Sequence, residues 1–236
     1  MRKATIVTLI LIYSSLLCIK SFALNNQTVT TQNIVVGLIT FPPFIQKEGN
    51  DKCYGSAIDD LQKIFSEHLY TLTFYCAPPS RIYRDFNQGL IDITINVKST
   101  ESLRANIIYS QKYYEVLEVV LYSKESKQNQ KVASIRSYNY HGTRQKLEFE
   151  GYEFVDVANT KEAIAVFLRG GTDSLLSYRQ PFEHYFNDGA KKRRYAAFNV
   201  SFTQKSFISV PSYFAVNTKN RKAQEIVDKI DAYFSR

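Results

Sequence analysis

Residues 89–122 read GLIDITINVKSTESLRANIIYSQKYYEVLEVVLY. Apolar side chains alternate along residues 91–97 and predict a buried strand that ends in the polar residues Asn96, Lys98, Ser99 and Thr100. A short charged turn with Arg104 follows, and the apolar run 116–122 predicts a second strand. Polar groups and an arginine at the carboxyl end of a strand are typical of ligand sites in α/β sheets. We therefore expect the loop between these strands to contribute to a binding site.

Strand and helix signals alternate in the residues that precede this stretch. The apolar runs 34–39 and 71–75 predict two strands. Between them, apolar residues spaced by three and four positions, from Ile58 to Leu69, predict an amphipathic helix. Pro78-Pro79-Ser80 predicts the start of a second helix, which Gly89 ends. This order of elements predicts a mostly parallel sheet with right-handed crossovers.

A second, smaller set of strands and helices follows a polar linker at 124–130. Asn159 and Glu162 have the spacing of a capping box, which predicts the start of one of its helices. The last apolar segment, 208–216, leads into a terminal amphipathic helix. The expected strands of this set are 131–135, 152–157 and 173–176, and its expected helices are 143–150 and 159–168. The terminal helix is expected at 223–234.

The two sets predict an α/β fold with two lobes joined by two crossing strands. The chain has 236 residues, enough for one large or two small domains. The first lobe is predicted to comprise residues 24–123 and 208–236, and the second lobe residues 124–207. Two lobes would explain why a second set of strands and helices follows a charged linker rather than extending one sheet.

The amino terminus has the features of a secretory signal peptide. Two basic residues precede an apolar run at 4–17, and Ser21-Phe22-Ala23 supplies the small residues of a cleavage site. We expect cleavage after residue 23 and a periplasmic mature protein. The alternative is a membrane anchor, but a transmembrane helix needs about 20 apolar residues.

Charge and cysteine content narrow the possible functions. Residues 1–23 contain three basic residues and no acid, so cleavage lowers the formal net charge from +8 to +5. We expect no nucleic-acid partner, because such partners require a basic face with interleaved aromatic residues, and the short basic run 191–194 is typical of a solvated loop.

Two cysteines remain after cleavage, Cys53 and Cys76, and an isolated pair in an oxidising compartment predicts a disulfide. No histidine lies near either cysteine at ligand spacing, so we expect no metal site. We also expect no cofactor.

The order of motifs resembles the bacterial extracytoplasmic solute-binding proteins of family 3, which bind amino acids in a type II periplasmic fold. The match consists of Gly89, Asp92, Ser99, Arg104 and the segment 109–114. By this resemblance, Arg104 pairs with a ligand carboxylate, and the planar guanidinium fork suits that group. Ser99 corresponds to a hydroxyl that hydrogen-bonds the same ligand.

Further positions in the first lobe follow from the same resemblance. Phe41 corresponds to an aromatic residue that stacks on the ligand, whereas Phe44 is expected in the core. Arg81 corresponds to an arginine at a helix start that faces the cleft, although a solvated helix arginine fits equally well. Lys98 is a candidate anion partner, and the alternative is a surface lysine. Glu101 stands where the family has a threonine.

The second lobe departs from the family pattern. The segment 137–144 replaces a short Gly-Thr-Thr turn, and we expect Tyr138 and Tyr140 to offer hydroxyls there, with an anion received at the following helix start. Tyr178 stands where the family often has an aspartate that binds the ligand ammonium group.

The resemblance implies a monomeric binding protein that closes about a hinge on a small polar ligand, an amino acid or related carboxylate. It would then present the ligand to an inner-membrane ABC permease or to a sensor. The alternatives are a dehydratase-like enzyme on the same fold, for which His141 is the histidine to test, and a structural partner without a ligand. We expect no enzyme, because the sequence carries no catalytic motif.

Overall fold

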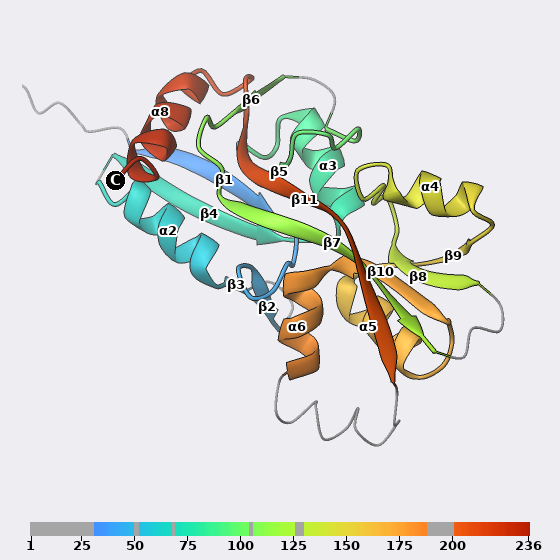
Figure 1. Ribbon diagram of the computed structural model, residues 1–236. Helices are drawn as coiled ribbons and strands as arrows, with labels where there is room; N and C mark the ends of the chain where they lie inside the picture. The colour runs from blue at the N-terminus through green and yellow to red at the C-terminus, as the bar shows by residue number, and fades with distance from the viewer. Residues whose placement is uncertain (1–30, 50–51, 68, 104–105, 126–129, 188–200) are drawn as a thin grey trace, which may run out of the picture. The chain divides into compact units, whose positions relative to one another are not determined.

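A nine-stranded sheet and a separate two-stranded hairpin organise residues 32–236 of the computed structural model, which form one unit by internal contacts (Figure 1). The structure describes residues 31–49, 52–67, 69–103, 106–125, 130–187 and 201–236. The predicted signal peptide, Arg104 and the basic run 191–194 lie outside these residues. Within the described ranges, no helix is long and apolar enough to cross a membrane.

The sheet has the strand order β4-β1-β5-β11-β7-β10-β8-β9, and β6 pairs with β11. Its strands are β1 (Gln32–Leu38), β4 (Tyr70–Cys76), β5 (Ile93–Val97), β6 (Ile107–Tyr109), β7 (Glu115–Lys124), β8 (Lys131–Ile135), β9 (Glu153–Val157), β10 (Ser174–Tyr178) and β11 (Phe202–Asn217). The hairpin consists of β2 (Gln46–Glu48) and β3 (Lys52–Tyr54). The helices are α2 (Ser56–Ile64), α3 (Pro79–Gln88), α4 (Thr143–Phe149), α5 (Thr160–Leu168), α6 (Arg179–Asn187) and α8 (Ala223–Tyr233).

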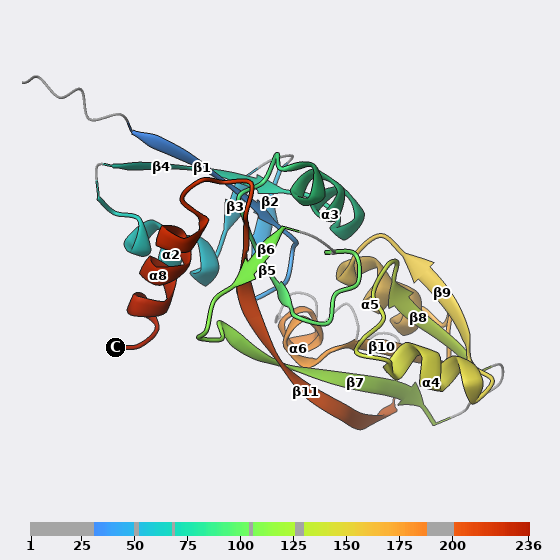
Figure 2. The same cartoon turned by 90° about the horizontal axis from the view of Figure 1, so that it is seen from above.

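Side chains of β1 point alternately to the two faces of the sheet, and helices cover both faces in its first half. Strand β1 runs parallel to β4 and β5. Ile34, Val36 and Leu38 are buried in a core cluster with residues of α2 and α8, whereas Val35 packs against a cluster built from α3. Figure 2 shows α3 on the opposite side of these strands from α2 and α8. The predicted strand–helix–strand order is therefore confirmed here.

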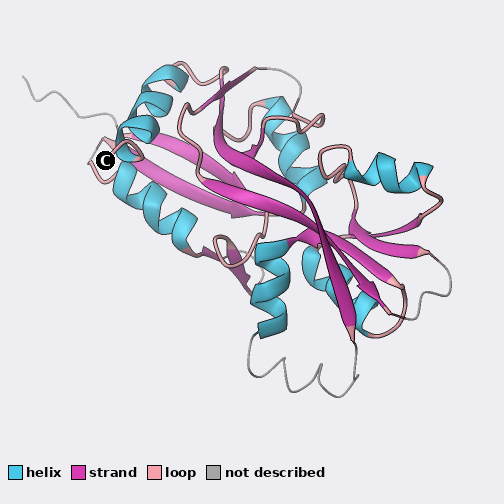
Figure 3. Cartoon of the chain, viewed as in Figure 1, coloured by secondary structure: helices cyan, strands magenta, loops and turns pink. Residues whose placement is uncertain are grey.

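The second half of the sheet repeats this arrangement. Strand β8 pairs in parallel with β9 and with β10. Leu147 of α4 packs in one cluster with Leu176 of β10, while Phe167 of α5 and Phe182 of α6 pack in another with Leu175. In Figure 3 the helices, drawn in cyan, lie along both sides of these strands.

Strands β7 and β11 connect the two halves. They pair antiparallel from Phe202–Lys124 to Ser212–Glu115, with a register shift between Ser206 and Ile208, and they run side by side in Figure 1. Beyond this pairing, β11 continues along β5, and β7 pairs with β10 on its other edge. The two predicted crossing strands are thus present. Strand β11 begins at Phe202, earlier than the predicted 208.

Local signals predicted the boundaries of α3 and the start of α5 correctly. Helix α3 begins at Pro79, and Gly89 ends it in the left-handed conformation (φ 84°) that favours glycine. The side chain of Asn159 accepts a hydrogen bond from the Glu162 N–H at 3.0 Å, which confirms the predicted cap. The prediction that Leu69 belongs to the apolar face of α2 is wrong. The helix ends at Ile64, and the Leu69 side chain is 47% exposed.

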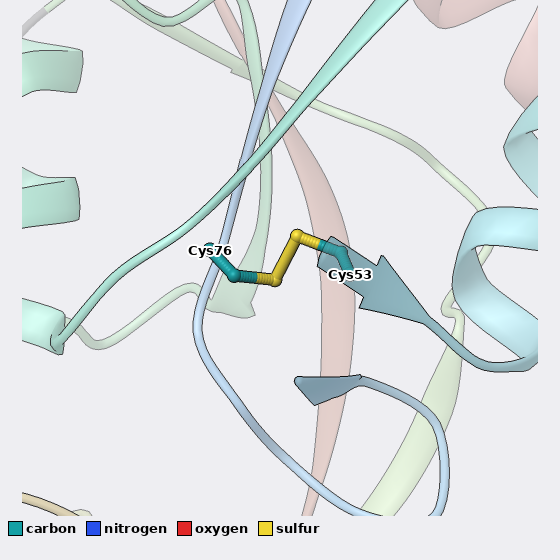
Figure 4. Close-up of a disulfide and its surroundings, with 2 residues drawn as sticks. All are labelled: Cys53 and Cys76. Carbon is teal, nitrogen blue, oxygen red and sulfur yellow. A yellow bond between two sulfur atoms is a disulfide. The ribbon is translucent and has the colours of Figure 1, made fainter. Parts of the chain in front are cut away.

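Cys53 and Cys76 form a disulfide, as the sequence predicted (Figure 4). Cys53 lies on β3 and Cys76 is the last residue of β4. The bond ties the small hairpin to the main sheet. The loop that carries Phe41 is closed separately, by a β-bridge between Phe41 and Ile45 just before β2.

Candidate functional site

A cavity of about 120 Å³ lies among residues from both halves of the sheet. This is about ten times the space that a single water molecule needs, roughly 10–15 Å³. A small organic ligand is therefore the occupant that its size suits. The lining residues are Ile39, Phe41, Phe44, Ile45, Tyr83, Ile95, Asn96, Val97, Thr100, Glu101, Ser102, Tyr114, Glu115, Leu117, Ser137, Tyr138, Asn139, Tyr140, Tyr178 and Ser212.

Aromatic rings form much of the cavity wall. The Phe41 and Tyr178 rings meet edge to face at 5.3 Å between centroids, and Tyr138 and Tyr140 lie within 6.3 Å of Tyr178. The Phe41 backbone is held by paired hydrogen bonds with Ile45, at 2.8 and 3.0 Å. The structure therefore brings together four of the predicted ligand contacts, Phe41, Tyr138, Tyr140 and Tyr178. Phe44, expected in the core, packs against a core cluster and also lines the cavity.

The tyrosines of the second half are neutral groups. Burial raises the pKa of Tyr138, Tyr140 and Tyr178 above the ordinary value of about 10. The Tyr140 hydroxyl accepts a hydrogen bond from the Ile135 N–H at 3.1 Å. At neutral pH these residues offer ring faces and uncharged hydroxyls to a ligand.

The backbone before α4 places these rings through unusual conformations. Ser137, Tyr140 and His141 have positive φ angles of 69°, 49° and 56°. Residues other than glycine rarely adopt this region, and such positions cluster at functional sites. At the start of α4, the N–H groups of Thr143 and Arg144 donate to the carbonyls of Tyr140 and Asn139. The expected anion contact at this helix start stays a prediction.

Polar side chains at the end of β5 complete one wall. Asn96 donates to the Tyr83 hydroxyl at 3.1 Å and accepts from the Thr100 hydroxyl at 2.7 Å. Burial raises the pKa of Tyr83 to about 12, so this network is uncharged at neutral pH. The sequence predicts this strand end as part of the binding site, and the structure adds Asn96 and Thr100 to the residues that line the cavity.

Two carboxylates, Glu101 and Glu115, also line the cavity. Glu115 is half-buried at the start of β7, and its Oε1 accepts a hydrogen bond from the Val116 N–H at 3.2 Å. Sequence reasoning did not predict Glu115 as a site residue. Glu115 reaches the cavity because β7 pairs with β11, which no local sequence pattern indicates.

The loop after β5 holds two further candidates outside the cavity lining. The Lys98 ammonium lies 4.0 Å from the Tyr213 ring centroid, in an exposed position. The Ser99 hydroxyl lies 2.6 Å from His141 Nδ1. Both residues border a shallow depression that also includes Leu103. In this structure they contact protein groups rather than the cavity.

The two predicted arginines have different outcomes. Arg81 is exposed at the first turn of α3, 3.9 Å from an Asp85 oxygen and 5.4 Å from the Tyr75 ring centroid. It does not line the cavity, which agrees with the solvated alternative. Arg104 lies outside the described residues, so its role as a carboxylate partner stays a prediction. No group of three potential metal ligands occurs within the described ranges.

Comparison with known proteins gives a family and a fold. The model of the bacterial extracellular solute-binding proteins, family 3, matches residues 34–235. No individual characterised protein sequence compared with the chain matches it significantly.

Solved structures of low sequence identity share the fold. An ancestral arginine-binding protein bound to arginine is 19% identical, with a TM-score of 0.69 over 87% of this chain and 92% of that one. A histidine kinase sensor domain with similarity to periplasmic binding proteins is 16% identical, with a TM-score of 0.70 over 87% and 90%. An arginine transport periplasmic binding protein from Legionella pneumophila is 15% identical, with a TM-score of 0.68 over 87% and 93%.

Proposed function

Because the chain belongs to the bacterial extracellular solute-binding proteins of family 3, we propose that it captures an amino acid or a related small carboxylate in the periplasm. Its fold is the α/β type II periplasmic-binding-protein fold, as the sequence predicted. The observation that carries the proposal is the aromatic cavity lined from both halves of the sheet, with Phe41 and Tyr178 in contact across it. Similar folds have been solved with arginine and with glutamine bound.

The mechanism we propose is hinge closure. Residues 24–123 and 208–236 would form one lobe and residues 124–207 the other, with β7 and β11 as the hinge. A ligand that contacts both lobes stabilises the closed arrangement, since it binds that arrangement better than the open one. An ABC permease would then recognise the closed monomer, and this recognition would deliver the ligand for transport.

The second candidate for the partner is a sensor protein rather than a permease. The similar histidine kinase sensor domain supports it at the level of the fold alone. The enzyme alternative depended on His141, which is not among the described lining residues of the cavity. We therefore propose binding rather than catalysis.

A thermal-shift screen of the mature protein tests this function. The panel contains amino acids, small carboxylates, amines and sugars, and one class is expected to raise the unfolding midpoint. A ligand at about 100 times its Kd stabilises the folded state by about 2.7 kcal/mol. If no compound in the panel shifts the midpoint, the proposal is wrong.

An arginine pair locates the carboxylate contact. Arg104→Ala is expected to abolish the shift, because the variant removes the predicted partner of the ligand carboxylate. Arg221→Ala is the matched control, since this exposed arginine precedes α8 and does not line the cavity. Equal loss in both variants would argue against a specific role for Arg104.

A further inference from the structure

We infer that the cavity selects an amino acid whose side chain ends in a positively charged amine or guanidinium group, and that Glu115 and the aromatic wall hold this group. This inference rests on the proposed function and names the ligand class of the same cavity. It assigns Glu115 as a specificity-determining residue.

The charge of the cavity wall is the first observation. Glu101 and Glu115 line it, and no described lining residue is lysine, arginine or histidine. The tyrosines of the wall stay neutral because burial raises the pKa of each, as described above for Tyr83 and Tyr178. A cation placed in the cavity would therefore be attracted by its wall, while an anionic group beside Glu115 would be repelled.

The second observation is that the β-sheet holds Glu115 in place. Ser212 is its partner in the pairing of β7 with β11. The Ser212 hydroxyl donates to the Glu115 carbonyl at 3.0 Å, and the Tyr114 N–H donates to the Ser212 carbonyl at 2.8 Å. These bonds fix the backbone on both sides of the Glu115 side chain. The hydrogen bond from the Val116 N–H to Oε1 orients the carboxylate itself. A preorganised carboxylate loses little conformational freedom when it binds a cation.

The Glu115 carboxylate has one oxygen committed locally. Its Oε1 accepts from the Val116 N–H, and no described residue donates a hydrogen bond to Oε2. Ammonium and guanidinium groups are donors without acceptors, so they match a carboxylate oxygen. Hydrogen bonds between such charged partners are stronger than neutral ones.

The aromatic rings next to Glu115 supply the rest of the contact. Tyr114 precedes it in sequence, lines the cavity and meets the Phe44 ring edge to face at 5.9 Å. Phe41 and Tyr178 complete the wall. Cations are attracted to the faces of such rings, most strongly where water is excluded. Carboxylate and rings together therefore favour a cation over a neutral group of the same shape.

Calorimetric titration of the mature protein with L-arginine, L-lysine, L-citrulline and L-glutamate tests the inference. Citrulline replaces the guanidinium group of arginine with a neutral urea of similar shape. We expect arginine or lysine to bind at least about tenfold more tightly than citrulline and glutamate, because a charge-assisted hydrogen bond is lost with the neutral analogue. Glu115→Gln is expected to weaken binding of the cationic probe about tenfold and to leave citrulline binding unchanged.

Glu153→Gln is the matched control for the removed charge, because Glu153 is exposed at the start of β9 and does not line the cavity. It is expected to change neither affinity. The ratio of arginine to citrulline affinity in the unmodified protein tests the ligand class even if Glu115→Gln does not fold.

The outcomes separate this inference from the proposed function. Equal affinity for arginine and citrulline, or tighter binding of citrulline or glutamate, would overturn the inference and leave the proposed function standing. An unchanged preference in Glu115→Gln would overturn the role of Glu115. No binding of any amino acid would overturn the proposed function and the inference together.

Discussion

The hydroxyl of Ser99 lies 2.6 Å from Nδ1 of His141, and this contact joins the loop after β5 to the loop before α4. Ser99 is exposed, whereas His141 is half-buried with a φ angle of 56°. The other ring nitrogen of His141 is buried and makes no hydrogen bond with a described residue. Burial lowers the pKa of His141 and therefore favours its neutral imidazole.

Acid is therefore expected to destabilise the folded protein through His141. The unfolded chain binds the proton with a pKa of about 6.5, and the folded chain binds it only at lower pH. The contribution is fully present above about pH 6.5 and is lost as the pH falls through the lowered pKa. Unfolding midpoints measured from about pH 7.5 to about pH 5 should fall less in His141→Gln than in the unmodified protein. Parallel curves for the two proteins would contradict this role.

The pair of Glu118 on β7 and Arg179 at the start of α6 makes a second electrostatic prediction. Hydrogen bonds from Arg179 and Ser206 lower the pKa of Glu118 to about 2. This stabilisation is present above the unfolded pKa of about 4.3 and is lost as the pH falls towards about 2. Both side chains are 27% exposed, so water screens the pair. Glu118→Gln should lower the free energy of unfolding at neutral pH by about 1–2 kcal/mol, measured by urea denaturation.

Glu183→Gln is the control for that pair. Glu183 lies 3.5 Å from the same arginine, and its side chain is 51% exposed. Its loss should cost less than about 0.5 kcal/mol. If Glu183→Gln lowered the free energy of unfolding more than Glu118→Gln, the pair of Arg179 with Glu118 would not be the main stabilising contact.

The fold was largely predictable because local patterns and packing agree. Ile34, Val36 and Leu38 occupy every second position of β1, and this alternation places them in one core cluster. Residues 202–207 carried no such signal. They are mostly polar and exposed, since this part of β11 is held by backbone pairing with β7 rather than by buried side chains.

The site was less predictable, because its residues come together through long-range pairing. The aromatic contacts Phe41 and Tyr178 followed from family resemblance, and the structure places them against each other. Glu115 lines the cavity because β7 pairs with Ser212 of a strand almost 100 residues away, a relationship that no local pattern contains. The motif around Arg81 fitted a cleft arginine and a solvated helix arginine equally well, so the sequence alone could not distinguish the two positions.

Loss of the disulfide is expected to destabilise the mature protein strongly. The bond between Cys53 and Cys76 closes a loop with a sequence separation of 23. Cross-linking a loop of this length stabilises by about 3 kcal/mol through the unfolded chain. Replacing both cysteines with serine should lower the free energy of unfolding by about this amount in urea denaturation. A reducing agent should reproduce the loss in the unmodified protein and have no effect on the double variant.

The amino-terminal cap of α5 gives a local test. Asn159 accepts a hydrogen bond from the Glu162 N–H, which would otherwise have no partner in the first turn. Asn159→Ala should cost about 1 kcal/mol in free energy of unfolding, whereas Asn159→Asp should change it little, since aspartate caps equally well. Equal destabilisation by both substitutions would argue that packing, rather than the cap, determines stability at this position.

The Phe41 ring is expected to matter for binding more than for folding. It is partly exposed at the cavity wall and contacts Tyr178 edge to face. Phe41→Ala should weaken binding of the ligand identified in the thermal-shift screen by roughly tenfold, because the ring face and its buried area are lost. The control is Tyr113→Ala, since Tyr113 is 57% exposed and does not line the cavity. Titration calorimetry of both variants should therefore show a weaker Kd for Phe41→Ala alone, and an unchanged Kd in that variant would place the ligand elsewhere.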